Sequence, residues 1–324
     1  MKAGLIINAS AGNFSKIKEK ITKLKEIFDE ITTGPGIFGK DFLEEAKVVD
    51  IKSSNFKDAI RELTVKLSEC SDVIVSVGGD GTANFIASTI IDEKINIPIM
   101  GIAGGTANVG SLVRFSLDNI KPPSYIETID CLKVWKGENH VGYAFVDAVF
   151  GDTFLGTLNN KLVNLSAKKF LKNGVKVEKK PRTWIGNEIK ILKNKRGIPI
   201  NMKNIAQIVA SPLNHSDFYI GKAITGSLSW AHFLKVDGCV ALSNKIIVDS
   251  YLDKKVLYET VTVEHILFEE NDCIEIDGFA EDVYVILDGN PMCECDEPIK
   301  LKVLKNCIKV FTDPCKRGYP VGWG

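Results

Sequence analysis

The sequence has no long apolar run and no excess of either charge. Its 324 residues include 41 basic and 41 acidic ones, so no overall field favours nucleic acid or a lipid surface. No apolar run approaches the roughly 20 residues that a membrane-spanning helix needs. The apolar run within residues 1–8 is too short and wrongly flanked for a signal peptide. We therefore expect a cytoplasmic protein that neither inserts into a membrane nor binds nucleic acid.

Several common catalytic signatures are also absent. There is no Gly-Lys-Ser/Thr and hence no Walker loop, and neither the glycine turn at Gly78 nor the one at Gly104 is a G-x-G-x-x-G dinucleotide fingerprint. No Cys or Ser stands in a recognisable nucleophile context. The eight cysteines are scattered, mostly inside apolar segments, which favours core residues over a disulfide framework. Cys293 and Cys295 form the one close pair, and without a second Cys or His pair nearby we assign no residue as a metal ligand.

Short apolar runs alternate with amphipathic helical patterns in the first part of the chain. The predicted strands cover residues 3–7, 46–51, 73–77 and 97–103, and the predicted helices cover residues 15–31, 55–70 and 83–91. This alternation predicts a parallel sheet with helices on both faces, in which ligands bind beyond the carboxyl ends of the strands. The turns at Asn8, Gly78 and Gly104 all follow strands, so we expect them to share that edge.

Beyond Pro122 and Pro123 the pattern changes to short strands without long helices. A hairpin is predicted over residues 126–150, and a basic, loop-like region over residues 168–203 surrounds a strand at 188–192. Further strands are predicted over residues 205–211, 238–248, 256–268, 273–276, 283–287, 299–304 and 307–312. We expect an α/β domain over residues 1–122 and a second domain, dominated by antiparallel sheet, over residues 123–306.

Two glycine-rich turns follow neighbouring strands of the predicted parallel sheet. They read Gly78-Gly79-Asp80-Gly81-Thr82 and Gly104-Gly105-Thr106-Ala107-Asn108. Glycines after a strand let backbone N–H groups converge on an anion, and the helix that follows adds its positive end. Two such turns side by side suit a ligand with several phosphates. The alternative is that the glycines only make tight turns.

Asp80 is the one acid enclosed by these glycines. It could cap the next helix, or it could act as a general base toward an acceptor hydroxyl or bind the magnesium that accompanies nucleotide phosphates. Phosphoryl transfer depends mostly on positioning and charge neutralisation, so one acid among phosphate-binding amides is sufficient for it.

These motifs resemble a known superfamily. Gly78-Gly79-Asp80-Gly81-Thr82 matches the GGDGT signature shared by NAD kinases and by diacylglycerol and sphingoid-base kinases. The turn at Asn8-Ala9-Ser10-Ala11-Gly12 resembles the superfamily's opening turn, with Ala9 in place of proline, and Gly105-Thr106-Ala107-Asn108 resembles its second glycine turn. The resemblance implies a nucleotide-binding, three-layer α/β domain like a Rossmann or flavodoxin domain, followed by a C-terminal β-sandwich.

The same resemblance implies an activity and a set of site residues. The protein would be a kinase that uses ATP with Mg²⁺ or Mn²⁺, with Asp80 as the essential catalytic carboxylate. The nucleotide would contact Asn8, Gly78, Gly79, Gly81, Thr82, Gly104, Gly105, Thr106 and Asn108. Residues 307–324 would return to the first domain, and the protein would form a homo-oligomer through its sandwich.

The acceptor depends on the branch of the superfamily. Thr225-Gly226-Ser227 looks like the NAD-kinase stretch that helps to hold the dinucleotide, and Asp288-Gly289-Asn290 resembles a late motif of both branches. Asn108 is followed by Val109, whereas lipid kinases usually continue with an acid. Against the NAD-kinase branch, its Asn-Glu/Asp motif falls at Val146-Asp147, where valine replaces the asparagine. Residues 147–156 look most like the divergent NAD-kinase-like group named after acetoin catabolism.

From these features we expect transfer of phosphate from ATP to the adenosine ribose 2′-hydroxyl of NAD. The acceptor would contact Asp147, Thr225, Gly226, Ser227 and Asp288. Two alternatives stay open because of Val146. The acceptor could be another alcohol, such as a lipid, a polyol or a nucleoside, or the protein could bind nucleotides without turnover.

A run of basic residues in the second domain is not explained by these motifs. It comprises Lys168, Lys169, Lys172, Lys176, Lys179, Lys180 and Arg182. The run could meet the phosphates of a ligand or could be a solvated face. It lacks the interleaved aromatic residues that base stacking requires.

Overall fold

The structure is a computed structural model, and it describes residues 1–53, 55–105, 108, 110–118, 120–159, 161–186, 188–213, 236–250, 255 and 258–312. The chain divides into two compact units. The first comprises Met1–Ile129 and the described residues from Asn306 onward, and the second lies between Asp130 and Lys305. No helix in the described ranges is long and apolar enough to cross a membrane.

The first unit is built on a parallel β-sheet. Its strands are β1 (Lys2–Ile7), β2 (Glu30–Thr33), β3 (Lys47–Val48), β4 (Val73–Gly78), β5 (Ile99–Ala103), β6 (Val113–Phe115) and the end of β20 (Ile299–Thr312). They pair in the order β20-β5-β4-β1-β2-β3, with β6 beside β5, and all these pairs are parallel. The turns after β1, β4 and β5 therefore share one edge of the sheet.

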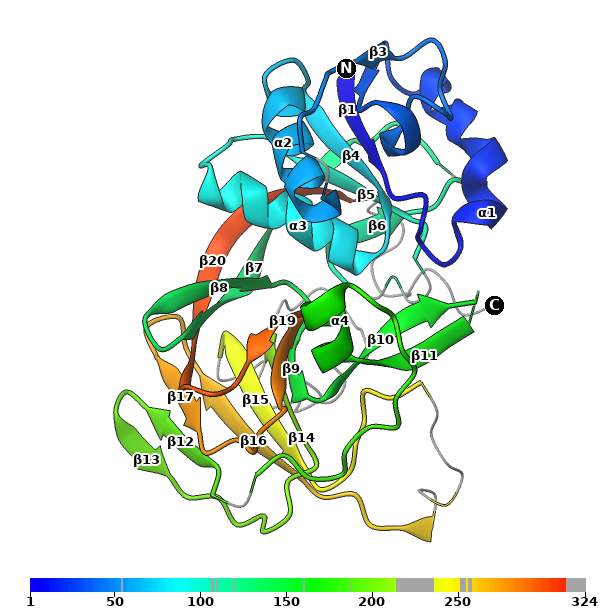
Figure 1. Cartoon of the computed structure of the whole chain (residues 1–324). Coiled ribbons are helices and arrows are strands. Elements are labelled where there is room, and N and C mark those ends of the chain that lie inside the picture. Colours follow the sequence, from blue (N-terminus) through cyan, green and yellow to red (C-terminus); the bar gives the residue numbers. More distant parts are fainter. Residues whose placement is uncertain are drawn as a thin grey trace. The chain divides into compact units, whose positions relative to one another are not determined.

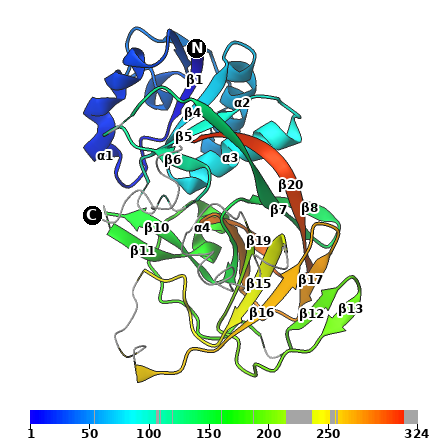
Figure 2. The ribbon, with the colours of Figure 1, turned by 180° about the vertical axis from the view of Figure 1, so that it is seen from behind.

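Helices lie on both sides of this sheet, as Figures 1 and 2 show from opposite directions. They are α1 (Phe14–Ile17) with the 3₁₀ helix η1 (Lys18–Glu26) on one side, and α2 (Phe56–Ser68) with α3 (Asp80–Asp92) on the other. Leu5 packs with Ile21 and Leu24 of η1. The next residue back along β1, Gly4, faces α2, and a Cβ there would lie 2.8 Å from the Cβ of Leu67. Alternation along β1 thus separates the two layers.

The prediction of one helix over residues 15–31 is wrong. The helical part consists of α1 and η1 and ends at Glu26, and a further 3₁₀ turn, η2, covers Gly36–Phe38. Residues 30–33 form β2, which the sequence did not predict. Thr33 Oγ1 donates to Leu5 O at 2.8 Å, so this segment is held as a strand by its neighbour β1. The apolar spacing continued into β2 because both a helix and a half-buried strand require apolar residues there.

The second unit is a β-sandwich. One layer has the order β16 (Val263–Phe268), β15 (Gly238–Ser243), β14 (Gln207–Pro212), β9 (Ala148–Gly151), β18 (Tyr284–Leu287) and β19 (Asn290–Glu294), all antiparallel. The other layer contains β13 (Arg196–Ile198), β12 (Lys190–Lys193), β17 (Ile274–Asp277) and the start of β20, with the hairpin of β7 (Tyr125–Lys136) and β8 (Asn139–Ala144). Phe150 and Phe268 pack against Ile276 and Leu301 in the core between the layers.

The outer face of the six-stranded layer has its own cover. The cover consists of the hairpin β10 (Thr153–Leu158) and β11 (Lys161–Ser166), followed by the short helix α4 (Ala167–Asn173), which Figure 1 shows in green. Leu165 and Phe170 pack against Val209 and Ile286 of the sheet. The sequence predicted the β7–β8 hairpin correctly but missed α4, because seven residues give too short a periodic pattern.

Acid stability gives a test of how α2 is attached. Glu62 of α2 accepts hydrogen bonds from Lys66, Ser53 and the backbone of Lys52, and these bonds, that of Lys66 first, lower its pKa from 4.5 to about 2. A depressed pKa contributes stability above pH 4.5, and this contribution is lost as the pH falls from 4.5 toward 2.

We expect Glu62→Gln to lower the free energy of unfolding at neutral pH and to have a much smaller effect near pH 2, where wild-type Glu62 has lost most of its contribution to stability. Urea unfolding at both pH values measures this. Glu69→Gln, at the exposed C-cap position of the same helix, is the control. An equal loss at both pH values would contradict the assignment.

Candidate active site

Three turns of the first unit meet at one edge of the parallel sheet. They follow β1, β4 and β5 and begin at Asn8, Gly78 and Gly104. Gly78 O accepts hydrogen bonds from Gly104 N at 2.8 Å and from Gly105 N at 3.1 Å. The two glycine turns predicted from the sequence are therefore in direct contact.

The contact between these turns requires glycine. A Cβ on Gly105 would lie 2.6 Å from the Cα of Gly79, and a Cβ on Gly79 would lie 3.2 Å from the Cα of Gly105. The N–H groups of Gly104 and Gly105 are engaged within the protein, so close packing of the two backbones explains these glycines without a ligand. An anion at this edge would have to use other amides, such as those at the positive end of α3.

Asp80 is the first residue of α3 and is half-buried. Its Oδ1 accepts a hydrogen bond from Gly110 N at 3.0 Å, so the carboxylate joins the β4 turn to the segment after β5. The N-cap position of α3 is Gly79, and no side-chain hydrogen bond caps the helix. Asp80 is therefore not the helix cap, and its catalytic role stays a prediction.

The predicted polar residues around Asp80 link the turns to one another. Asn8 Nδ2 donates to Thr82 Oγ1 at 2.8 Å, and Asn8 Oδ1 accepts from Ser10 N at 3.0 Å. Asn108, in the left-handed region at φ 46°, accepts from Gly105 N through Oδ1 and donates to Gly105 O through Nδ2. The structure thus brings Asn8, Thr82 and Asn108 to the edge occupied by Asp80. Their binding of nucleotide stays a prediction.

Asn13 belongs to the same group and was not found from the sequence. Its backbone N–H donates to Gly104 O at 3.0 Å, and its Nδ2 donates to Gly105 O at 2.8 Å. These bonds attach the β1 turn to the β5 turn. Its only signal in the sequence is its place directly after the Asn8–Gly12 turn, which does not distinguish it from other loop asparagines.

In the second unit, Asp288 and Asp147 are brought together by their backbones. Asp288 is 6% exposed, and its carboxylate accepts hydrogen bonds from the N–H groups of Phe145 at 2.9 Å, Val146 at 2.8 Å and Asp147 at 3.0 Å. In return, Asp288 N donates to Asp147 O. The carboxylate of Asp288 therefore fixes the turn that presents Asp147, which is a positioning role.

The same turn contains Val146, at the position where the resemblance to NAD kinases predicts an asparagine. Val146 is 4% exposed, and its carbonyl oxygen accepts a hydrogen bond from Ser211 Oγ at 2.6 Å. Asp147, in contrast, is only half-buried. Ser211 was not identified from the sequence, because its hydroxyl acts through backbone atoms 65 residues away.

Four predicted site residues, Thr106, Thr225, Gly226 and Ser227, lie outside the described residues. In the ranges that are described, no group of three or more His, Cys, Asp or Glu side chains could hold a metal ion. A single carboxylate such as that of Asp80 is compatible with a Mg²⁺ site in which phosphates and water supply the other ligands.

A side chain at Gly105 tests the contact between the turns. We expect Gly105→Ala to lower the free energy of unfolding by about 1–3 kcal/mol, because overpacked backbones must move apart. Gly197→Ala is the matched control, since a Cβ there meets no atom within 4 Å and its φ is not positive. Chemical denaturation of both variants measures the difference. Equal stability of the two variants would contradict the close-packing assignment.

Removal of the Asp288 charge tests whether this carboxylate holds the turn that presents Asp147. In Asp288→Asn one of the three backbone N–H groups would face an amide NH₂, so we expect about 1–3 kcal/mol less stability. The same substitution at the exposed Asp50 should have little effect. Thermal and urea unfolding compare the two proteins. A wild-type unfolding curve for Asp288→Asn would show that these hydrogen bonds are dispensable.

Comparison with known proteins gives one family match and several similar folds. Residues 38–133 match the diacylglycerol kinase catalytic domain. An uncharacterised protein of Archaeoglobus fulgidus is 28% identical over 298 residues, which covers 90% of this chain and 92% of that protein. The residues that match the diacylglycerol kinase catalytic domain include the Asp80 turn and the turn at Gly104.

Solved structures with the same fold come from two kinase groups. A diacylglycerol kinase from Bacillus anthracis str. Sterne has a TM-score of 0.53 at 12% identity and covers 97% of both chains. Yeast NADH kinase, solved with NADH, has a TM-score of 0.54 at 12% identity and covers 98% of this chain and 85% of that one. At these identities the likeness concerns the fold alone. Residues 38–133 are therefore similar to a diacylglycerol kinase catalytic domain, and the chain has a fold that is also found in a diacylglycerol kinase and in an NADH kinase.

Proposed function

We propose that the protein transfers the terminal phosphate of ATP to an alcohol. The observation that carries this proposal is the position of Asp80. Its half-buried carboxylate stands at the end of β4 and the start of α3, where the three turns of the parallel sheet meet. Asp80 is not the N-cap residue of α3, and a hydrogen bond from Gly110 N holds its carboxylate in place.

The donor would bind at the start of α3. The 13-residue helix directs its positive end to this edge, which favours phosphate oxygens. The hydrogen bonds among Asn8, Thr82, Gly105 and Asn108 hold the surrounding turns in one arrangement before the ligand arrives, so less ordering is needed on binding. A Mg²⁺ held by the phosphates would supply charge neutralisation.

Asp80 would act on the acceptor hydroxyl. The acceptor oxygen forms a bond to the γ-phosphorus while the bond from that phosphorus to the β–γ bridging oxygen breaks. ADP leaves, and the hydroxyl proton passes to the Asp80 carboxylate. The hydrogen bond from Gly110 N orients the carboxylate for this transfer.

For the acceptor, we first propose the adenosine ribose 2′-hydroxyl of NAD, which would give NADP. The support consists of the Thr225-Gly226-Ser227 stretch and the likeness in fold to yeast NADH kinase. In the second unit, the half-buried Asp147 would contact this acceptor, and Asp288 would keep the Asp147 turn in position. From the same resemblance we propose a homo-oligomer.

A second candidate acceptor is a lipid alcohol. The family match over residues 38–133 is to diacylglycerol kinases. In addition, the side chain of Val146 is buried where NAD kinases place an asparagine, so that side chain offers no hydrogen bond to an adenine or ribose. The placement in the group named after acetoin catabolism stays a prediction that bears on neither acceptor.

An acceptor screen decides between these candidates. The purified protein is incubated with Mg²⁺ and γ-labelled ATP, and with NAD, diacylglycerol in mixed micelles, or simple polyols and nucleosides. Label in NADP supports the first candidate, and label in phosphatidic acid supports the second. If ATP binds but no alcohol becomes labelled with either Mg²⁺ or Mn²⁺, the protein is a nucleotide-binding module and the proposed activity is wrong.

Asp80→Asn tests the catalytic role. With the best acceptor from the screen, we expect kcat to fall by about 10²- to 10⁴-fold, because the amide cannot accept the hydroxyl proton. The KM for ATP should change little. Asp41→Asn, at an exposed position in the same unit, is the control. Near-normal turnover of Asp80→Asn with unchanged ATP binding would disprove the role of Asp80.

A further inference from the structure

One surface of the second unit is strongly basic although the whole chain is neutral. It is formed by β11, α4 and the segment that follows, residues 161–184, and we call it the basic surface. Glu178 is its single acidic residue, against eight cationic residues: Lys161, Lys168, Lys169, Lys172, Lys176, Lys179, Lys180 and Arg182. Equal totals of 41 basic and 41 acidic residues in the chain conceal this local excess.

The basic surface also exposes large apolar side chains. Among the described residues, twelve large hydrophobic side chains are exposed, and five of these belong to residues 161–184. They are Leu162, Leu171, Val175, Val177 and Trp184, with Val175 at 50% the most exposed of the five. Single exposed apolar residues are ordinary, but several within one short segment that is also rich in lysine indicate an interaction surface.

Backbone hydrogen bonds hold this surface together. Ser166 N donates to Val177 O at 2.8 Å and Lys179 N donates to Asn164 O at 3.0 Å, so the segment after α4 runs beside β11. The helix is capped at its start by Ser166, whose Oγ accepts from Lys169 N, and at its end by Gly174, which has a left-handed φ of 67°. The lysines and apolar side chains are thus carried on a fixed backbone.

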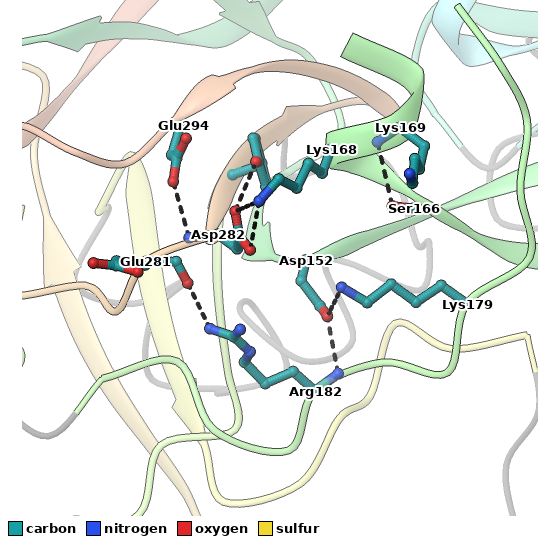
Figure 3. Close-up of polar contacts among 10 residues, drawn as sticks. Asp152, Ser166, Lys168, Lys169, Lys179, Arg182, Glu281, Asp282 and Glu294 are labelled. Carbon is teal, nitrogen blue, oxygen red and sulfur yellow. Dashed lines mark hydrogen bonds and ion pairs between the residues drawn. The ribbon is translucent and has the colours of Figure 1, made fainter. Parts of the chain in front are cut away.

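Two carboxylates anchor part of the cationic set, as Figure 3 shows. Asp152, only 3% exposed, accepts from Arg182 N at 3.0 Å and from Lys179 Nζ at 2.8 Å. Asp282 accepts from Lys168 Nζ at 2.7 and 2.9 Å, and this hydrogen bond lowers the pKa of Asp282 below its ordinary value. These two anchors hold the start of α4 and the stretch at residues 179–182 against the β-sandwich.

Four further lysines of the basic surface have no side-chain partner among the described residues. The side chains of Lys161, Lys169, Lys172 and Lys180 make no hydrogen bond or ion pair with any residue that the structure describes, and all four residues are exposed. Their charges are therefore not neutralised within the described protein, and they lie beside the exposed Leu171, Val175 and Val177 in the sequence.

We propose that the basic surface docks on a bilayer that contains anionic phospholipids. Lysines attract the anionic headgroups while the aliphatic side chains enter the boundary between headgroups and acyl chains, and a tryptophan at the edge is typical of such interfaces. Nucleic acid explains the charge but not the apolar residues, because leucine and valine do not stack on bases. The docking is peripheral and does not depend on the proposed phosphotransferase activity.

Vesicle co-sedimentation of the whole protein tests the proposal. We expect binding to vesicles of phosphatidylglycerol mixed with phosphatidylcholine, no binding to vesicles of phosphatidylcholine alone, and release as the salt concentration rises. The Asp80→Asn variant should bind as the wild type does, which separates docking from catalysis. Equal binding to both kinds of vesicle, or to neither, overturns the proposal.

Matched variants locate the contact. We expect the triple variant Lys169→Ala, Lys172→Ala and Lys180→Ala to bind anionic vesicles on the order of a hundredfold more weakly. The control removes three exposed lysines elsewhere (Lys52→Ala, Lys190→Ala and Lys203→Ala) and should bind within a few-fold of the wild type. Equal weakening in the two triple variants would indicate an effect of total charge and overturn the proposal.

A second variant tests the apolar contribution. Val175→Ser with Val177→Ser keeps every charge and alters two exposed side chains, so the fold should be retained. We expect severalfold weaker binding to anionic vesicles. Unchanged vesicle binding would overturn the amphipathic assignment. Retention of the wild type on a single-stranded oligonucleotide, without vesicle binding, would assign the surface to nucleic acid and also overturn it.

Discussion

The carbonyl oxygen of Gly78 is the atom on which the candidate active site depends. It accepts hydrogen bonds from the N–H groups of both Gly104 and Gly105, and these bonds hold the β4 and β5 turns together. The contact is possible because neither Gly79 nor Gly105 has a side chain. Asp80 follows directly at the start of α3, so its position is a consequence of this backbone contact.

The second unit uses buried carboxylates for comparable purposes. Asp288 accepts three backbone N–H groups and fixes the turn at residues 145–147, and Asp152 accepts the backbone of Arg182 together with Lys179. A buried carboxylate without partners would be very costly, so each one orders the segment that supplies its donors. One carboxylate thereby orders the Asp147 turn, and the other orders the basic surface.

The fold was predictable where the spacing of the apolar residues was compatible with only one type of secondary structure. Helix α2, capped by Asn55, and strands β4 and β5 lie within a few residues of their predicted positions, and the β7–β8 hairpin was also recognised. The prediction failed for β2, whose apolar residues continue the spacing of η1, and for α4, which is too short to show a period. In both cases, contacts with distant strands decide the local structure.

The sequence by itself determined the parallel and antiparallel halves of the protein and the convergence of three turns at one sheet edge, with Asp80 in one of these turns. These follow from local periodicity and from glycine chemistry, which neighbouring residues display. Only the tertiary structure decided that the amides of Gly104 and Gly105 are engaged inside the protein and that Asp288 supports the Asp147 turn. It alone showed which lysines of the basic surface have no partner within the described part of the chain. The physical reason is that a hydrogen bond depends on both the donor and the acceptor. Here the partners lie far apart in the chain, so local sequence patterns do not reveal them.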